Sequence, residues 1–251
     1  WRADLEAPLF ATPAMWDINK DGVGEMLIVN GHGKAMGLNG VDGKRLWENA
    51  IEHRVDSAPV VAKLSGKGEI GLGFGSHNKT YYMLDAERGT VIWKYQAREV
   101  IEHASSLADI DGDGFSDVVF CDRAGWVYAV KGNSGKLLWN SLLFHKKCTT
   151  TPLVVDYNSD GLPDVWVGDP VGWLYILAGR GPVVTSLRQF PVAPAILATP
   201  ILFQSHSAGF LLALPSQEKG KPALILLPLQ PQFSPSPKGW WKYLGHQRNA
   251  G

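Results

Sequence analysis

A repeat of 46 to 48 residues runs through most of the chain and limits the folds that are open to it. Each repeat begins with a small residue that is usually followed by proline, just before a short apolar segment. These pairs are Thr12-Pro13, Ala58-Pro59, Ala104-Ser105, Thr151-Pro152 and Thr199-Pro200. Self-similarity at a fixed period of this size is typical of propellers and other repeat arrays.

Each repeat also contains a regular series of short apolar segments, which we interpret as strands. The third strand is clearest in Trp126–Val130 and Trp173–Leu177, and a turn and a fourth strand follow it. The predicted second strands are Glu25–Val29, Ile70–Phe74, Asp117–Cys121, Asp164–Val167 and Phe210–Leu214. Four short strands per period of about 45 residues predict a propeller blade. We therefore expect an all-β fold, a β-propeller of four-stranded antiparallel blades, with five repeat units between residues 1 and 230.

Three units carry an acidic loop between the first and second strands. In the third unit it runs from Asp109 to Asp117, with carboxylates at positions one, three, five and nine and Gly114 at position six. Glycine there allows the positive φ that a tight curl needs. Because converging carboxylates repel one another, the loop predicts a bound cation, Ca²⁺ before Mg²⁺.

The same pattern recurs in the first and fourth units, so we expect about three Ca²⁺ ions per chain. Backbone carbonyls at the seventh position would complete each shell. The predicted metal ligands are Asp17, Asn19, Asp21, Val23 and Glu25; Asp109, Asp111, Asp113, Phe115 and Asp117; and Asp156, Asn158, Asp160, Leu162 and Asp164.

The second and fifth units lack this pattern. In the second, Lys63, Ser65 and Lys67 stand where the first unit has its acidic positions, and lysine cannot ligate Ca²⁺. In the fifth, Gln204–Gly209 contains no carboxylate. We expect both of these loops to be metal-free.

A glycine precedes a tryptophan in the turn between the third and fourth strands of three units. These turns are Gly40–Trp47, Ala86–Trp93 and Gly132–Trp139. The glycine suits a hairpin turn that requires positive φ. The tryptophan is large and apolar, and we predict that it packs between neighbouring blades rather than on a cofactor.

These two motifs carry family resemblances. The acidic loops resemble the FG-GAP or VCBS repeats of integrin-type propellers, and that resemblance implies Ca²⁺ in the loop between first and second strands. The glycine-to-tryptophan turns resemble the repeats of quinoprotein-like propellers, which include the pyrroloquinoline quinone dehydrogenases. Those enzymes commonly use adjacent cysteines beside the cofactor, whereas Cys121 and Cys148 are far apart in this sequence.

Composition restricts the possible functions further. The 24 basic and 24 acidic residues give a net charge of zero, which does not support nucleic-acid binding. No apolar run is long enough to span a membrane. We interpret the two cysteines as isolated thiols in preference to a disulfide.

The ends of the chain depart from the repeat. Trp1–Leu5 reads as a fourth strand, which either completes the last blade of a five-bladed ring or ends a blade that precedes the first. We therefore expect the sequence to be a piece of a longer protein. After residue 230 the repeat gives way to a proline-rich connector, and we expect the aromatic tail Trp240–Gly251 to dock on the propeller.

The end of the propeller opposite the acidic loops would carry the connections between second and third strands and between blades. Polar residues gather in these predicted loops and suggest a recognition surface, although loops are generally polar. The candidate ligand-binding residues are His32, His53, Arg54, His77, His103, Asp122, Arg123 and His145.

No serine-hydrolase elbow, zinc-protease helix or phosphate-binding loop occurs in the sequence. We therefore predict a non-catalytic, calcium-binding propeller that recognises a protein or carbohydrate outside the cytoplasm or on a cell surface. Two alternatives stay open: a quinone-dependent or sugar-active enzyme, and a structural module of a larger receptor.

Overall fold

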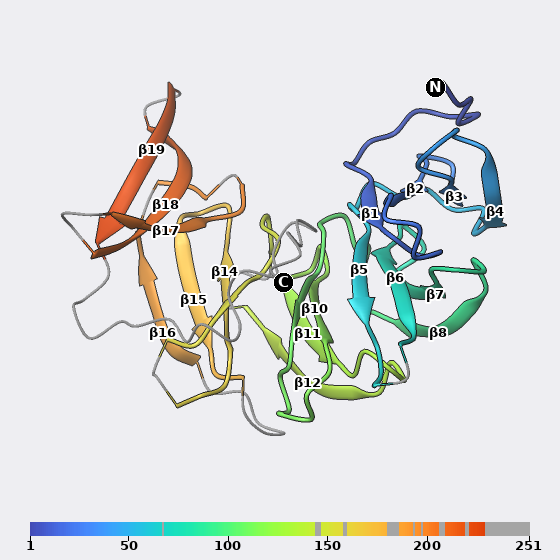
Figure 1. The fold of residues 1–251 in the computed structure, drawn as a ribbon. Coiled ribbons are helices and arrows are strands. Elements are labelled where there is room, and N and C mark those ends of the chain that lie inside the picture. Colours follow the sequence, from blue (N-terminus) through green and yellow to red (C-terminus); the bar gives the residue numbers. More distant parts are fainter. Residues whose placement is uncertain are drawn as a thin grey trace.

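The computed structural model describes residues 1–66, 68–143, 147–157, 160–179, 186–192, 194–196, 198–205, 209–218 and 221–228. Within these ranges every regular element is a β-strand, and the strands form five antiparallel sheets. The sheets follow one another around an arc in chain order (Figure 1). The predicted all-β fold of propeller blades is confirmed.

Each of the first four sheets consists of four strands in chain order, and the fifth consists of three. The first sheet contains β1 (Ala14–Trp16), β2 (Glu25–Val29), β3 (Lys34–Leu38) and β4 (Arg45–Ala50). The second contains β5 (Val60–Lys63), β6 (Ile70–Gly75), β7 (Thr80–Asp85) and β8 (Val91–Gln96). The third contains β9 (Ser106–Ala108), β10 (Asp117–Cys121), β11 (Trp126–Val130) and β12 (Leu137–Leu142). The fourth contains β13 (Leu153–Val155), β14 (Asp164–Gly168), β15 (Trp173–Leu177) and β16 (Ser186–Pro191), and the fifth contains β17 (Ile201–Ser205), β18 (Gly209–Glu218) and β19 (Lys221–Pro228).

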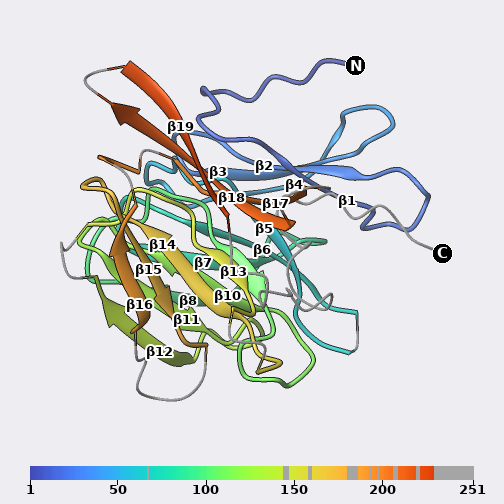
Figure 2. The same ribbon diagram turned by 90° about the vertical axis from the view of Figure 1, so that its left-hand side faces the viewer.

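The middle strands of each blade are buried on both faces. All five residues of β10 and of β14 are buried, and so are the last four of β11 and of β15. This explains their nearly continuous apolar sequences, since a strand between two neighbouring sheets has no solvent-facing side. The first strands β1, β5, β9 and β13 contact one another in order, which places them on the inner side of the arc. Figure 2 shows the arc from the side of the fifth sheet.

Consecutive blades are joined by a tryptophan that lies over the turn of the next blade. The indole N–H of Trp47 donates to the carbonyl of Ala86 (2.9 Å), and that of Trp93 donates to Gly132 (2.7 Å). A Cβ on Gly89, whose φ is +71°, would lie 2.3 Å from the Trp47 ring. Glycine is therefore required here twice, for its positive φ and for the close approach of the ring. The prediction that these tryptophans pack between blades is confirmed.

Trp1 makes the same contact with the first blade. Its indole N–H donates to the carbonyl of Gly40 (2.9 Å), and a Cβ on Gly43 would lie 2.3 Å from its ring. Residues 1–5 form no strand, and Ala3 and Leu5 pack on the first blade. The first and fifth sheets lie apart in Figure 1. Closure of a five-bladed ring by this segment is therefore not the arrangement observed.

Two further predictions concern the termini and membranes. The connector and tail, residues 231–251, lie outside the described residues, so their docking stays a prediction. In the described part of the chain, no helix has the length and hydropathy needed to cross a membrane.

The contact between blades gives a direct stability test. Trp93 is buried, with 8% of its surface exposed, whereas its neighbour Ile92 is 42% exposed. Trp93→Ala should lower the free energy of unfolding by about 3–5 kcal/mol, because it opens a cavity between the second and third blades. Ile92→Ala should cost about 0.5–1 kcal/mol. Denaturant unfolding of both variants checks this, and equal losses would contradict the role given to the tryptophan.

Candidate functional site

The acidic loops connect the first and second strands of the first, third and fourth blades, as predicted. Their sixth-position glycines, Gly22, Gly114 and Gly161, have φ values of +89°, +89° and +87°. An L-amino acid with a side chain rarely adopts this conformation, so the glycine determines the curl of each loop.

Backbone N–H groups fold back onto the carboxylates of each loop. The sixth residue donates to the first-position aspartate, and the seventh residue donates to the fifth-position aspartate. The first set is Gly22 N to Asp17 (3.0 Å), Gly114 N to Asp109 (2.8 Å) and Gly161 N to Asp156 (2.9 Å). The second set is Val23 N to Asp21 (2.8 Å), Phe115 N to Asp113 (3.0 Å) and Leu162 N to Asp160 (2.9 Å). The described parts of the three loops therefore share the same two hydrogen bonds.

The ninth-position carboxylates, Glu25, Asp117 and Asp164, are buried. Asp117 accepts hydrogen bonds from the N–H groups of Ile110 (3.0 Å) and Gly132 (3.2 Å), and so ties the loop to the turn between β11 and β12. Burial raises the pKa of Asp117 to about 6, although these N–H groups oppose the shift.

The third loop brings together the groups that a hard cation needs. Carboxylate oxygens of Asp109, Asp111 and Asp117 lie within 4.8 Å of one another. Asp109 Oδ1 is buried and has no hydrogen-bond partner among the described residues. A buried carboxylate oxygen without a partner is costly, and a bound cation would satisfy it. The residues present therefore fit a Ca²⁺ ion.

In the first loop a side-chain amide already connects the carboxylates. Asn19 Nδ2 donates to Asp21 (2.9 Å) and to Glu25 (3.2 Å). The Asn19 side-chain oxygen accepts a hydrogen bond from Asp21 N (2.9 Å). A bound cation would require this amide to turn so that its oxygen faces the carboxylates. In the fourth loop, Asn158 lies outside the described residues.

A lysine that sequence analysis did not single out reaches the third loop. Lys131 Nζ lies 2.7 Å from Asp111 Oδ2 and 2.8 Å from Asp113 Oδ2. The ion pair lowers the pKa of Asp113 and raises that of Lys131. The acidic-loop pattern could not reveal this contact, because Lys131 lies outside the loop, in the turn between β11 and β12.

The second and fifth loops are only partly described. In the second loop, Lys63 is the last residue of β5 and Ser65 lies two residues further on, but Lys67 lies outside the described residues. In the fifth loop, residues 206–208 lie outside the described residues. The prediction that both loops are metal-free stays a prediction.

At the opposite end of the blades, Asp122 holds a turn together. Its Oδ1 accepts hydrogen bonds from the N–H groups of Ala124 and Trp126, both at 3.0 Å, and its Oδ2 accepts one from the hydroxyl of Tyr128 (2.8 Å). Asp122 is only 1% exposed. Its carboxylate therefore shapes the turn from within, rather than presenting a contact on the surface.

The other candidates form small groups on this face. His77 Nε2 lies 2.9 Å from Asp56, which also accepts hydrogen bonds from Arg54 Nε. Burial raises the pKa of Asp56, but the bonds from Arg54 and His77 outweigh it, so that this pKa lies below its usual value. The Arg54 guanidinium lies 5.2 Å from the centre of the Phe10 ring.

The other candidates lie in neighbouring connections. The backbone of His53 packs against the turn that carries His32, because a Cβ on Gly33 would lie 2.1 Å from the His53 carbonyl oxygen. Both histidines are exposed. Arg123 is 61% exposed and lies 3.6 Å from Glu102. His145 lies outside the described residues.

His103 is partly buried beside the third blade. Burial lowers its pKa, while Glu102 and the backbone of Cys148 act in the opposite direction. The pKa of His103 therefore lies below the usual value for histidine, because burial disfavours the charged imidazolium.

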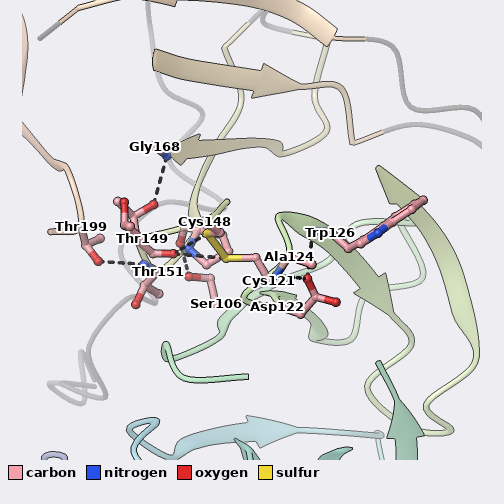
Figure 3. The surroundings of a disulfide bond; sticks show 12 residues. Ser106, Cys121, Asp122, Ala124, Trp126, Cys148, Thr149, Thr151, Gly168 and Thr199 are labelled. Atoms are coloured by element: carbon pink, nitrogen blue, oxygen red, sulfur yellow. Dashed lines mark hydrogen bonds between the residues drawn. A yellow bond between two sulfur atoms is a disulfide. The ribbon is translucent and has the colours of Figure 1, made fainter. Parts of the chain in front are cut away.

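Cys121 and Cys148 form a disulfide, so our preference for isolated thiols was wrong. Figure 3 shows the bridge, which joins the end of β10 to the connection that leads to β13. The two Cα atoms are 6.4 Å apart, within the range that a disulfide spans. Both sulfur atoms lie close to the carbonyl oxygen of Thr150, at 3.3 and 3.2 Å.

The repeat contained the signal for this bridge. The same two positions touch in other blades, where a Cβ on Gly75 would lie 2.1 Å from Ile101, and one on Gly168 would lie 2.7 Å from Ile196. Each pair couples the end of a second strand to the connection that follows the blade. In the third blade a disulfide replaces this apolar contact.

Reduction of the disulfide should destabilise the chain. For a sequence separation of 27 residues, loop-closure entropy gives a loss of about 3–4 kcal/mol. Cys121→Val with Cys148→Val, which copies Val29 and Val55 of the first blade, should keep the packing and make melting insensitive to reductant. Thermal melting with and without a dithiol checks this. A wild-type melting curve unchanged after both thiols titrate as reduced would contradict it.

Comparisons with known proteins agree with this architecture. The family model described as outer membrane protein assembly factor BamB (PQQ_2) matches residues 1–181. No protein with a curated description matches the chain. The quinoprotein-like part of the resemblance is confirmed, whereas the comparisons do not support the FG-GAP and VCBS part, which stays a prediction.

Solved structures share the fold at low sequence identity. BamB from Moraxella catarrhalis is 18% identical with a TM-score of 0.59, over 85% of this chain and 58% of that one. The biofilm matrix protein Bap1 of V. cholerae is 20% identical with a TM-score of 0.65, over 90% of this chain and 40% of that one. BBS1N, solved in complex with ARL6DN, is 10% identical with a TM-score of 0.60, over 88% of this chain and 62% of that one. The chain thus spans less than two thirds of each of these structures.

Proposed function

The chain belongs to the family of the outer membrane protein assembly factor BamB, and from this premise we propose that it is a non-catalytic propeller that binds a protein partner outside the cytoplasm. Membership of this family is the observation that carries the proposal. The name of the family describes a factor for protein assembly, which fits a binding role better than an enzymatic one. A disulfide between blades is also in keeping with an oxidising compartment.

We place the binding surface on the face opposite the acidic loops. Arg54, Arg123, His32 and His53 are all exposed there, at the tips of neighbouring connections. Fixed turns hold these tips in place, as Asp122 and the disulfide do in the third blade. A rigid scaffold that presents polar and cationic side chains suits an acidic or hydroxyl-rich partner surface, through charge-assisted hydrogen bonds.

We further propose that Ca²⁺ binds the acidic loops and stabilises the blades. The unpartnered Asp109 oxygen and the convergence of Asp109, Asp111 and Asp117 support this for the third loop. The hydrogen bonds that the first and fourth loops share with the third extend it to them. Bound Ca²⁺ would neutralise the carboxylates, while this chain's own glycine curls and backbone bonds hold them in position.

A quinone-dependent activity receives no comparable support. Cys121 and Cys148 are bonded to each other but are separated by 27 residues, so they are not the adjacent pair that the quinone dehydrogenases commonly use. Nothing in the described geometry assembles a nucleophile with a general base.

Chelation should lower the melting temperature of the chain, and added Ca²⁺ should restore it. Binding to the folded state alone stabilises it by about 2.7 kcal/mol per site at a hundredfold excess over the dissociation constant. Asp109→Asn should weaken this Ca²⁺ response without harming the metal-free protein, because it removes a buried charge that has an unpartnered oxygen. Ser65→Ala in the second loop is the control. A melting curve that ignores both chelator and Ca²⁺ would refute the proposal.

Substitutions on the exposed face should weaken binding without loss of stability. Once a partner is identified from an envelope extract, Arg54→Ala and Arg123→Ala should each raise its dissociation constant by roughly tenfold, about 1.4 kcal/mol. Lys44→Ala is a matched control, because Lys44 is 82% exposed in a turn at the acidic-loop end. Binding kinetics and melting curves of the three variants separate the two effects. Equal affinity of all three for a purified protein partner, or binding to a glycan array alone, would count against the proposal.

A further inference from the structure

The third acidic loop has one more carboxylate than the other two. It has aspartate at position three, whereas the first and fourth loops have Asn19 and Asn158 there. The third loop thus contains four carboxylates, and each of the others contains three. Lys131 Nζ contacts the additional aspartate, Asp111, at 2.7 Å. One ammonium group therefore offsets the carboxylate that the third loop has in addition to the three of each other loop.

Lys131 is specific to this blade. It directly precedes Gly132, whose N–H donates to Asp117. The same hydrogen bond in the fourth blade runs from Gly179 to Asp164, so Ala178 is the matching residue there. In the first blade the matching residue is Asn39, which accepts a hydrogen bond from Val41 N (2.8 Å) and so caps its own turn. Among these three blades, the position is cationic only in the blade with the additional aspartate.

The ion pair is partly shielded from water. The side chains of Lys131, Asp111 and Asp113 are 28%, 25% and 30% exposed, and the ammonium lies between the two carboxylates. Partial burial strengthens such a pair beyond an ordinary surface salt bridge. A Ca²⁺ ion that uses the same two carboxylates would repel the ammonium at this distance. Lysine and metal therefore compete for the loop.

We infer that Lys131 is the built-in counter-charge of the third loop and competes there with Ca²⁺, which makes this loop a weaker Ca²⁺ site than its four carboxylates alone would form. The inference rests on the proposed function, since it takes the loop to be a Ca²⁺ site. The lysine stabilises the metal-free loop and opposes metal uptake. Its removal should therefore have opposite effects on these two properties, a result that a purely structural lysine would not produce.

The first experiment concerns the metal-free protein and does not depend on Ca²⁺. In chelator, Lys131→Met should lower the melting temperature, because it leaves Asp111 and Asp113 without their counter-charge. In an Asp111→Asn background the same substitution should cost clearly less, since one charge is already gone. An equal loss in both backgrounds would overturn the assignment of Lys131 as counter-charge to this loop.

The second experiment measures Ca²⁺ binding to the third loop by calorimetry on the full chain. Asp17→Asn and Asp156→Asn weaken the first and fourth loops while keeping an acceptor for their glycine N–H groups. In this background Lys131→Met should tighten Ca²⁺ binding by roughly tenfold or more, because charge in the ligand shell controls affinity. Lys136→Met removes the same charge from the same turn but not from the loop, and should leave the affinity unchanged.

The outcomes separate this inference from the proposed function. Uptake of Ca²⁺ by the wild-type chain, with a third-loop affinity that Lys131→Met leaves unchanged, would overturn the competition and leave Ca²⁺ binding in place. Absence of Ca²⁺ uptake by the wild type and by every variant would overturn Ca²⁺ binding itself, and the competition with it. Ca²⁺ binding that is tighter in Lys131→Met but unchanged in Lys136→Met supports both Ca²⁺ binding by the loop and its competition with Lys131.

Discussion

The architecture depends on one contact that is repeated between blades, a tryptophan ring lying over a glycine in the next turn. A single four-stranded sheet with apolar residues on both faces cannot bury them by itself. Trp47 and Trp93 join each blade to its successor through an indole N–H bond and a ring that leaves no room for a Cβ on Gly89 or Gly135. Trp1 makes this contact without belonging to a strand. The contact therefore requires only the tryptophan and the glycine-containing turn that it covers, and the tryptophan need not belong to a sheet.

Local patterns explain why much of this could be predicted. The second strands end within one residue of their predicted limits in the first four blades, because turn glycines and apolar runs are close together in sequence. The fifth departs most, since β18 extends to Glu218 where Leu214 was expected. The disulfide was missed because its two cysteines are far apart in sequence, although Val29 and Val55 occupy the same positions in the first blade. The Lys131 contact was missed because it joins the acidic loop to the turn between β11 and β12, and no sequence-spacing rule predicts such a contact.

Two aspartates at opposite ends of the third blade, Asp122 and the half-buried Asp109, differ in how many of their carboxylate oxygens have hydrogen-bond donors. Asp122 has N–H or O–H donors on both oxygens and needs no further partner. Asp109 has a glycine N–H on one oxygen, while its other oxygen is buried without a donor among the described residues. This difference distinguishes an aspartate that shapes a turn from one suited to a cation. It also locates the candidate metal chemistry and the candidate recognition surface at opposite ends of the same strands.

The proposed Ca²⁺ sites would suit a Ca²⁺-rich environment. The side chains of the candidate ligands Asp111 and Asp113 are partly exposed, and a donor or counter-charge already contacts the first and third loops, from Asn19 and Lys131 respectively. The proposed Ca²⁺ sites, with partly solvated ligands and internal competitors, would lie toward the weak end of protein Ca²⁺ affinities, the range of extracellular modules. Sites this weak would stay empty at cytosolic Ca²⁺ levels and fill outside the cytoplasm. The disulfide between Cys121 and Cys148 forms and persists under the same external conditions. The proposed Ca²⁺ sites and the disulfide are therefore compatible with the same extracytoplasmic compartment.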